Sequence, residues 1–89
     1  MKQYLLKVKE IELRYHPGNN NRRVKYNDKD FDILMIRFSF EDKELLFAIR
    51  AIELPDTDSI HLRYNPIGKS VNWSPKALEK CMKDITGLL

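Results

Sequence analysis

The chain has 89 residues, of which 43% are hydrophobic and 33% charged, and its formal net charge is +3. This length allows one hydrophobic core and excludes a second domain, and the composition is that of a folded chain rather than a disordered one. The longest nearly uncharged apolar run, residues 31–36, falls far short of the roughly 20 residues that a membrane helix needs.

These features predict that residues 1–89 form a single domain in the cytoplasm, with no membrane segment. Lys7 and Lys9 interrupt the first apolar stretch before it could serve as a secretion signal. The only cysteine, Cys81, cannot form an intrachain disulfide, which agrees with a reducing compartment. We interpret Cys81 and Trp73 as structural residues.

The first 26 residues predict a long strand, a loop and a short returning strand. Apolar residues alternate with lysines from Tyr4 to Val8 and then change parity at Ile11. This change predicts a β-bulge near Lys9 and Glu10 within a strand over about residues 4–15. Residues 16–23 contain Pro, Gly and three Asn residues and predict a mobile loop, and residues 23–26 predict the second strand.

A β-hairpin of residues 31–40 and 44–54 is the best-specified element. If Phe40 pairs with Leu45, the apolar residues of both strands fall on one face. That face would hold Leu34, Ile36, Phe38, Phe40, Phe47 and Ile49.

The second half of the chain predicts two short strands and then a helix. Residues 60–64 and 70–73 alternate in polarity as half-buried strands do. Ser74 and Pro75 form a typical helix start, and Leu78, Cys81, Met82 and Ile85 make an apolar stripe over residues 75–86. The expected fold is therefore α+β: a small, mostly antiparallel sheet of about five strands, with the C-terminal helix packed on the apolar face of the hairpin.

The opposite face of this sheet is where we expect a binding site. The hairpin places Arg37 and Arg50 there among apolar residues, and a matching orientation of strand 60–64 would add His61 and Arg63. Charge is also uneven along the chain: residues 1–30 carry +4, residues 31–60 carry −4 and residues 61–89 carry +3. A sheet with arginines among apolar side chains suits single-stranded DNA or RNA, so the predicted nucleic-acid-binding residues are Arg22, Arg23, Lys25, Arg37, Arg50, His61 and Arg63.

Two alternatives to nucleic-acid binding stay open. The same face, with Ile33, Met35, Ala48 and Ile52, also suits a homodimer, a protein partner, or an inhibitor or accessory role. An edge strand, above all residues 60–64, offers a further place for a partner to add a strand. In the other alternative, the arginines cover apolar surface with their stems or pair with neighbouring carboxylates, and they bind no other molecule.

An enzymatic role is not expected. His16 and His61 are the only histidines, and their positions give no metal spacing. The pairs Asp28/Asp30 and Asp56/Asp58 lie in predicted turns, where aspartate is favoured for local hydrogen bonds. The sequence therefore predicts a non-enzymatic binding module with no metal and no small-molecule cofactor.

Overall fold

The computed structural model describes residues 3–13, 21–40, 43–65 and 70–89, and these residues are mostly in strands. The strands are β1 (Leu6–Leu13), β2 (Asn21–Lys25), β3 (Ile33–Phe40), β4 (Lys43–Arg50), β5 (Ser59–Asn65), β6 (Ser70–Ser74) and β7 (Lys83–Asp84). The helical elements are the 3₁₀ turns η1 (Ala51–Glu53) and η2 (Thr86–Leu88) and the short helix α1 (Leu78–Cys81). Within the described ranges, no helix has the length and apolar character needed to cross a membrane.

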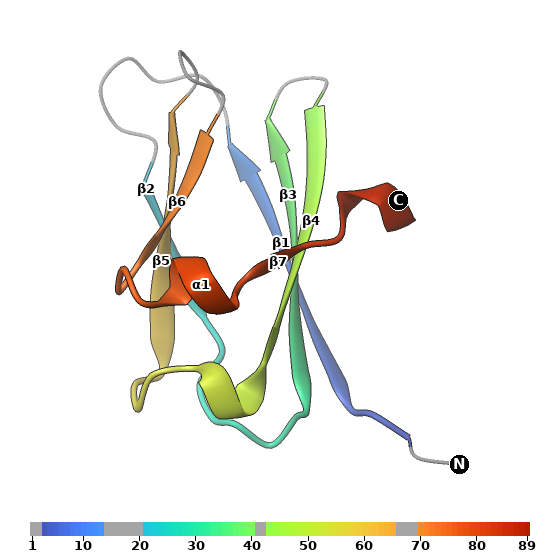
Figure 1. The fold of residues 1–89 in the computed structure, drawn as a ribbon, viewed down its shortest axis with the longest axis vertical. Coiled ribbons are helices and arrows are strands. Elements are labelled where there is room, and N and C mark those ends of the chain that lie inside the picture. The colour runs from blue at the N-terminus through green and yellow to red at the C-terminus, as the bar shows by residue number, and fades with distance from the viewer. Residues whose placement is uncertain (1–2, 14–20, 41–42, 66–69) are drawn as a thin grey trace.

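The strands are divided between two sheets. Sheet A has the order β1-β3-β4-β7 and sheet B the order β2-β5-β6, and Figure 1 shows the two sheets side by side with α1 between them. All pairings are antiparallel except that of β1 with β3, which is parallel because the chain leaves sheet A to form β2 before it returns. The expectation of one sheet of about five strands is therefore wrong, although a small, mostly antiparallel strand structure is present.

The hydrophobic core lies between the sheets. Sheet A contributes Leu34, Ile36, Phe38, Phe40, Phe47 and Ile49, the residues expected on the apolar face of the hairpin. Sheet B contributes Val24, Ile60, Leu62, Tyr64 and Trp73, and Tyr26 follows β2 into the same core. Aromatic rings join the sheets: the ring of Tyr64 packs at a tilt against those of Phe38 and Phe40, with centroid distances of 5.1 and 4.8 Å. A second sheet, rather than a helix, therefore covers the apolar face.

The predicted hairpin is present as β3 and β4, but its register differs by two residues. Phe40 is opposite Lys43, and Phe38 is opposite Leu45. Two residues lie between the paired residues Phe40 and Lys43, whereas a pairing of Phe40 with Leu45 would leave four. Because side chains alternate with a period of two, this shift leaves every side chain on its predicted face. After Arg50 the chain forms η1 instead of continuing as a strand to residue 54.

β1 has no bulge. Its register with β3 runs without interruption from Leu6 opposite Ile33 to Leu13 opposite Phe40. The change of parity has another cause: Leu6 and Val8 point to the outer face and are exposed, whereas Ile11 points inward and packs against the core. The start of β1 thus presents its apolar side chains to solvent, a feature that alternating polarity alone does not predict.

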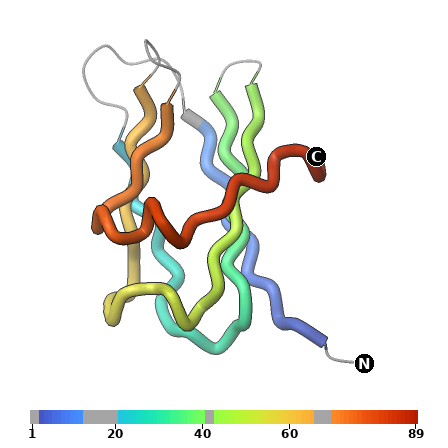
Figure 2. The backbone as a smooth tube through the Cα atoms, in the orientation of Figure 1, coloured from blue at the N-terminus to red at the C-terminus, as the bar shows by residue number. Residues whose placement is uncertain are grey.

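The predicted helix over residues 75–86 is wrong. Ser74 is the last residue of β6, and α1 covers only four residues, of which Leu78 is buried in the core. Cys81 and Met82 pack against the core as predicted, but Lys83 and Asp84 then extend and pair with the free edge of β4. A helix of this length is marginal by itself, so hydrogen bonds to an open strand edge outcompete it. Figure 2 shows this segment crossing from sheet B to sheet A.

Residues 84–86 hold the C-terminal segment on β4. The amide of Leu46 donates to the Thr86 hydroxyl at 3.0 Å, and the amide of Ile85 donates to the Leu46 carbonyl at 2.8 Å. The hydroxyl and the amide of Thr86 both donate to the carboxylate of Asp84. These two hydrogen bonds lower the pKa of Asp84 below its ordinary value of 3.8.

This lowered pKa predicts a pH-dependent contribution of Asp84 to stability. A carboxylate whose pKa is depressed in the folded state stabilises the fold fully at pH values above its pKa in the unfolded chain. This stabilisation is lost as the pH falls through the pKa of the folded state. At pH 7 we expect Asp84→Asn to have a lower urea midpoint than the unsubstituted protein, and the difference to shrink below pH 3.8. Asp56→Asn, in an exposed turn, serves as the control and should match the unsubstituted protein within about 0.5 kcal/mol. A difference that does not vary with pH would contradict the prediction.

Candidate nucleic-acid interface

The outer face of sheet B, called the basic face below, is polar throughout. Side chains alternate along each strand, so inward residues such as Val24, Leu62 and Trp73 leave the residues between them on the outside. The outward residues are Asn21, Arg23 and Lys25 of β2, Ser59, His61, Arg63 and Asn65 of β5, and Ser70, Asn72 and Ser74 of β6.

The chemistry of the basic face favours an anionic, oxygen-rich ligand. It combines three cations and a histidine with three asparagines and three serines, and these ten residues include no carboxylate and no apolar side chain. All are exposed except Ser59, which is half-buried. Arg and Lys attract phosphate, and Asn and Ser donate hydrogen bonds to phosphate and sugar oxygens.

Cross-strand pairing sets the spacing of the charged groups. Arg23 is directly opposite His61, and Arg63 lies between Asn21 and Asn72. Lys25 and Arg63 form no ion pair with any residue that the structure describes. A hollow of about 370 Å³ opens on this face, with Asn21, His61, Arg63 and Asn72 among its lining residues. Polar donors therefore converge around this hollow.

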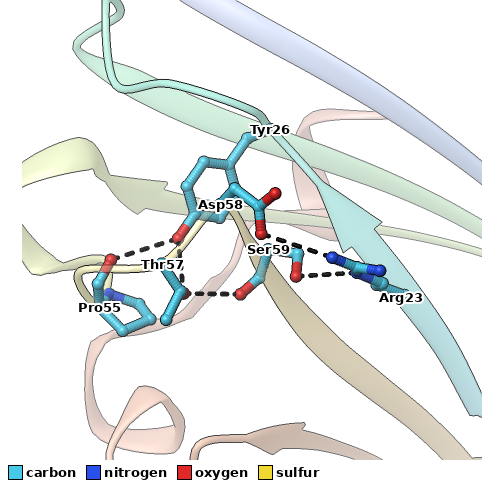
Figure 3. A network of polar contacts seen from close by, with 6 residues as sticks. All are labelled: Arg23, Tyr26, Pro55, Thr57, Asp58 and Ser59. Atoms are coloured by element: carbon cyan, nitrogen blue, oxygen red, sulfur yellow. Dashed lines mark hydrogen bonds and ion pairs between the residues drawn. The ribbon is translucent and has the colours of Figure 1, made fainter.

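Arg23 is paired with a carboxylate. Its Nε donates to Ser59 Oγ at 2.9 Å, and its Nη2 lies 3.4 Å from the carboxylate of Asp58, as Figure 3 shows. The backbone carbonyl of Asp58 also accepts hydrogen bonds from the amides of Tyr26 and Asn27. The start of β5 is thus fixed to β2, which holds Arg23 in place at the edge of the basic face.

Four of the seven predicted site residues lie on this face, and three do not. Arg23, Lys25, His61 and Arg63 are together on sheet B. Arg22 shares an inward-facing position with Leu62 and donates from Nη1 to the carbonyl of Asn21 at 2.9 Å. The predicted loop over residues 16–23 included Arg22 and Arg23, but both are in β2; residues 16–20 of that loop lie outside the described residues.

Arg37 and Arg50 lie on the outer face of sheet A, so the expectation that His61 and Arg63 join them is wrong. Each arginine is paired: Arg37 with both carboxylate oxygens of Glu44 at 3.1 and 3.2 Å, and Arg50 with Glu53 at 2.9 Å. The hydrogen bond raises the pKa of Arg50 and lowers that of Glu53. The alternative in which arginines pair with carboxylates therefore describes these two residues, and the strands that carry them never share a sheet with β5.

The outer face of sheet A differs in chemistry from the basic face. Its hollow of about 350 Å³ is lined by three carboxylates and one arginine, with Glu10, Glu12, Arg37 and Glu44 among the lining residues. The same face also carries an apolar strip of four residues from β1 and β3: Leu6, Val8, Ile33 and Met35. Ile33, Met35 and Ala48, named above for a protein interface, do share this face, while Ile52 lies in η1.

Sequence reasoning missed the six asparagines and serines of the basic face. Their signal was present: in β5 and β6 every second residue is polar, and the residues between them are buried or half-buried and apolar. Only the assignment of these strands to a sheet of their own, however, places Asn21, Asn72 and Arg63 in one row.

No group of three or more His, Cys, Asp or Glu residues suited to a metal ion occurs in the part of the chain that the structure describes. The fold and the basic face together define a two-sheet β domain with one polar, cationic outer surface. The chain matches no known family model, and no curated protein or solved structure matches it. Its function has to be inferred from the side chains that this fold presents.

Proposed function

We propose that the protein is a binding module that holds nucleic acid by its phosphate and sugar groups on the basic face. The observation that carries this proposal is the composition of that face, where ten outward residues include three cations and no carboxylate. Phosphate oxygens are the ligand for which Arg23, Lys25 and Arg63 are suited, with His61, Asn and Ser as additional donors.

The basic face supports contacts to the backbone rather than to bases. Tyr26, Tyr64 and Trp73, the aromatic residues of sheet B and its flank, are all buried in the core. Among the ten outward residues of sheet B there is no aromatic ring on which a base could stack. Duplex DNA has the higher charge density, so we expect it to bind at least as tightly as a single strand, in contrast to the single-strand preference expected from sequence.

The test is fluorescence anisotropy with labelled single-stranded and duplex oligonucleotides over a range of salt concentrations. About three phosphate contacts predict a slope of log K against log salt near −3 and a loss of roughly 40-fold in affinity between 50 and 200 mM salt. Arg63→Gln and Lys25→Gln should each reduce the slope by about one and weaken binding to all sequences alike.

Arg37→Gln is the matched control, because it removes the same charge from the other sheet, where Arg37 is paired with Glu44. It should leave the slope unchanged. If Arg37→Gln and Arg63→Gln weaken binding equally, net charge rather than the basic face is responsible. If the unsubstituted protein fails to bind at 50 mM salt, the proposal is wrong.

A further inference from the structure

One edge of sheet A is open within the described part of the chain. β1 pairs with β3 on one side, and no described strand pairs with its other side. Leu5 directs its backbone toward β3: its carbonyl accepts from the amides of Asp32 and Ile33, and its amide donates to the Asp32 carboxylate. Backbone groups alternate in direction along a strand, so those of Leu6 and Val8 point to the open edge.

Exposed apolar side chains are concentrated at this edge. Tyr4, Leu5, Leu6 and Val8 are 55%, 65%, 55% and 55% exposed, and they make up four of the seven exposed large hydrophobic residues that the structure describes. Leu6 and Val8 continue an apolar strip across Ile33 and Met35 of β3. An open strand edge next to an exposed apolar strip is typical of a site where another strand adds.

We propose that the occupant is β1 of a second copy, paired antiparallel about a two-fold axis at Leu6. A two-fold axis perpendicular to the sheet keeps the outer faces of both copies on the same side. Such an axis lies midway between one residue and the same residue of the second copy. With the axis at Leu6, Tyr4 faces Val8 of the second copy, Leu5 faces Lys7 and Gln3 faces Lys9. Aromatic and β-branched residues directly opposite each other stabilise antiparallel pairs.

Charge selects this register over its neighbours. An axis at a charged residue, namely Lys7, Lys9, Glu10 or Glu12, places that residue opposite the same residue of the second copy, so like charges meet. An axis at Val8 places Lys7 opposite Lys9, and an axis at Ile11 places Glu10 opposite Glu12. An axis at Leu5 sets Val8 against Lys2. Of these axes, only the one at Leu6 combines three properties. It pairs Val8 with an apolar residue, it places all four exposed apolar residues opposite the second strand, and it brings no like charges together.

Lysines in an edge strand often prevent such pairing, but Lys7 is already engaged in its own subunit. Its Nζ donates to the carbonyl of Tyr26 at 2.6 Å and lies 5.6 Å from the centroid of the Phe31 ring. The side chain therefore points into the space between the sheets rather than across the open edge. Addition of a second strand buries no unpartnered charge at this position.

Cysteine cross-linking in a Cys81→Ser background tests the register, with Leu6→Cys and Val8→Cys as matched variants of equal exposure. In the proposed dimer the two Leu6 Cα atoms are about 5.5 Å apart, within the range that a disulfide spans. The two Val8 Cα atoms are offset by four residues, about 14 Å, which a disulfide does not span. Mild oxidation should convert Leu6→Cys to a covalent dimer and leave Val8→Cys monomeric. Cross-linking of Val8→Cys alone, or of both variants equally, would overturn the proposal.

Sedimentation equilibrium gives an independent readout without cysteine. The unsubstituted protein should sediment as a dimer, and Leu6→Lys, which places two ammonium groups opposite each other, should sediment as a monomer with an unchanged circular dichroism spectrum. Ile52→Lys introduces the same charge at a site that is 85% exposed in η1 and should remain a dimer. A monomeric mass for the unsubstituted protein throughout the micromolar range would also overturn the proposal.

Discussion

Trp73→Ala is expected to lower the free energy of unfolding by about 3–5 kcal/mol, the cost typical of truncating a buried tryptophan or phenylalanine. Trp73 is only 6% exposed, and its ring packs edge-on against Phe47 with a centroid distance of 5.2 Å and an interplanar angle of 79°. The pair joins β6 of sheet B to β4 of sheet A. Domains of this size have only a few kcal/mol of stability to lose, so much of the variant should be unfolded at 25 °C.

The measurement is urea denaturation followed by circular dichroism. Trp73→Phe retains a ring against Phe47 and should lose less than half as much stability, whereas Ile52→Ala, at an exposed site, should change it by about 0.5 kcal/mol or less. If Trp73→Ala loses no more stability than Ile52→Ala, the two sheets do not share a core.

Tyr26→Ala is the second large effect, and we expect a loss of about 3–5 kcal/mol by the same mechanism of cavity formation. Tyr26 is fully buried and its ring is 6.2 Å from that of Phe31. Its hydroxyl lies 3.3 Å from the carbonyl of Pro55 and 3.4 Å from the hydroxyl of Thr57, which Figure 3 shows at the turn before β5. One side chain therefore supports both the core and this turn.

Tyr26→Phe separates the two contributions. It keeps the ring and removes the hydroxyl, so it should cost about 1 kcal/mol, the usual net value of one hydrogen bond. Both variants are compared by their urea midpoints, with equal dependence on urea concentration as the check for unchanged two-state unfolding. Equal losses for Tyr26→Phe and Tyr26→Ala would show that the hydroxyl, and not the packing of the ring, dominates.

The two outer faces suit different partners. Sheet B presents cations and amides, while sheet A presents apolar residues beside Glu10 and Glu12. The sequence-based hypotheses placed nucleic-acid binding and protein binding on one face, where they compete. On separate sheets, the two proposed interactions do not exclude each other, and Arg63→Gln and Leu6→Lys test them separately.

The sequence by itself determined the approximate positions of β1 to β6, and the direction in which the side chains of β3, β4 and β5 point. A period of two is local information, so the apolar faces of β3, β4 and β5 were correct even where the register of β3 with β4 was shifted by two residues. Arg23, Lys25, His61 and Arg63 were likewise recognised as candidates from their residue types alone.

Only the tertiary structure decided which strands share a sheet, and through this which cations share a face. Pairing depends on contacts between residues far apart in the chain, such as Asn21 with Arg63, and alternation does not encode them. The same reason explains the C-terminal error: the stripe from Leu78 to Ile85 fits a helix, but the open edge of β4 offers backbone hydrogen bonds that residues 83–86 take instead. Periodicity describes one segment, whereas a strand edge is a property of the assembled sheet.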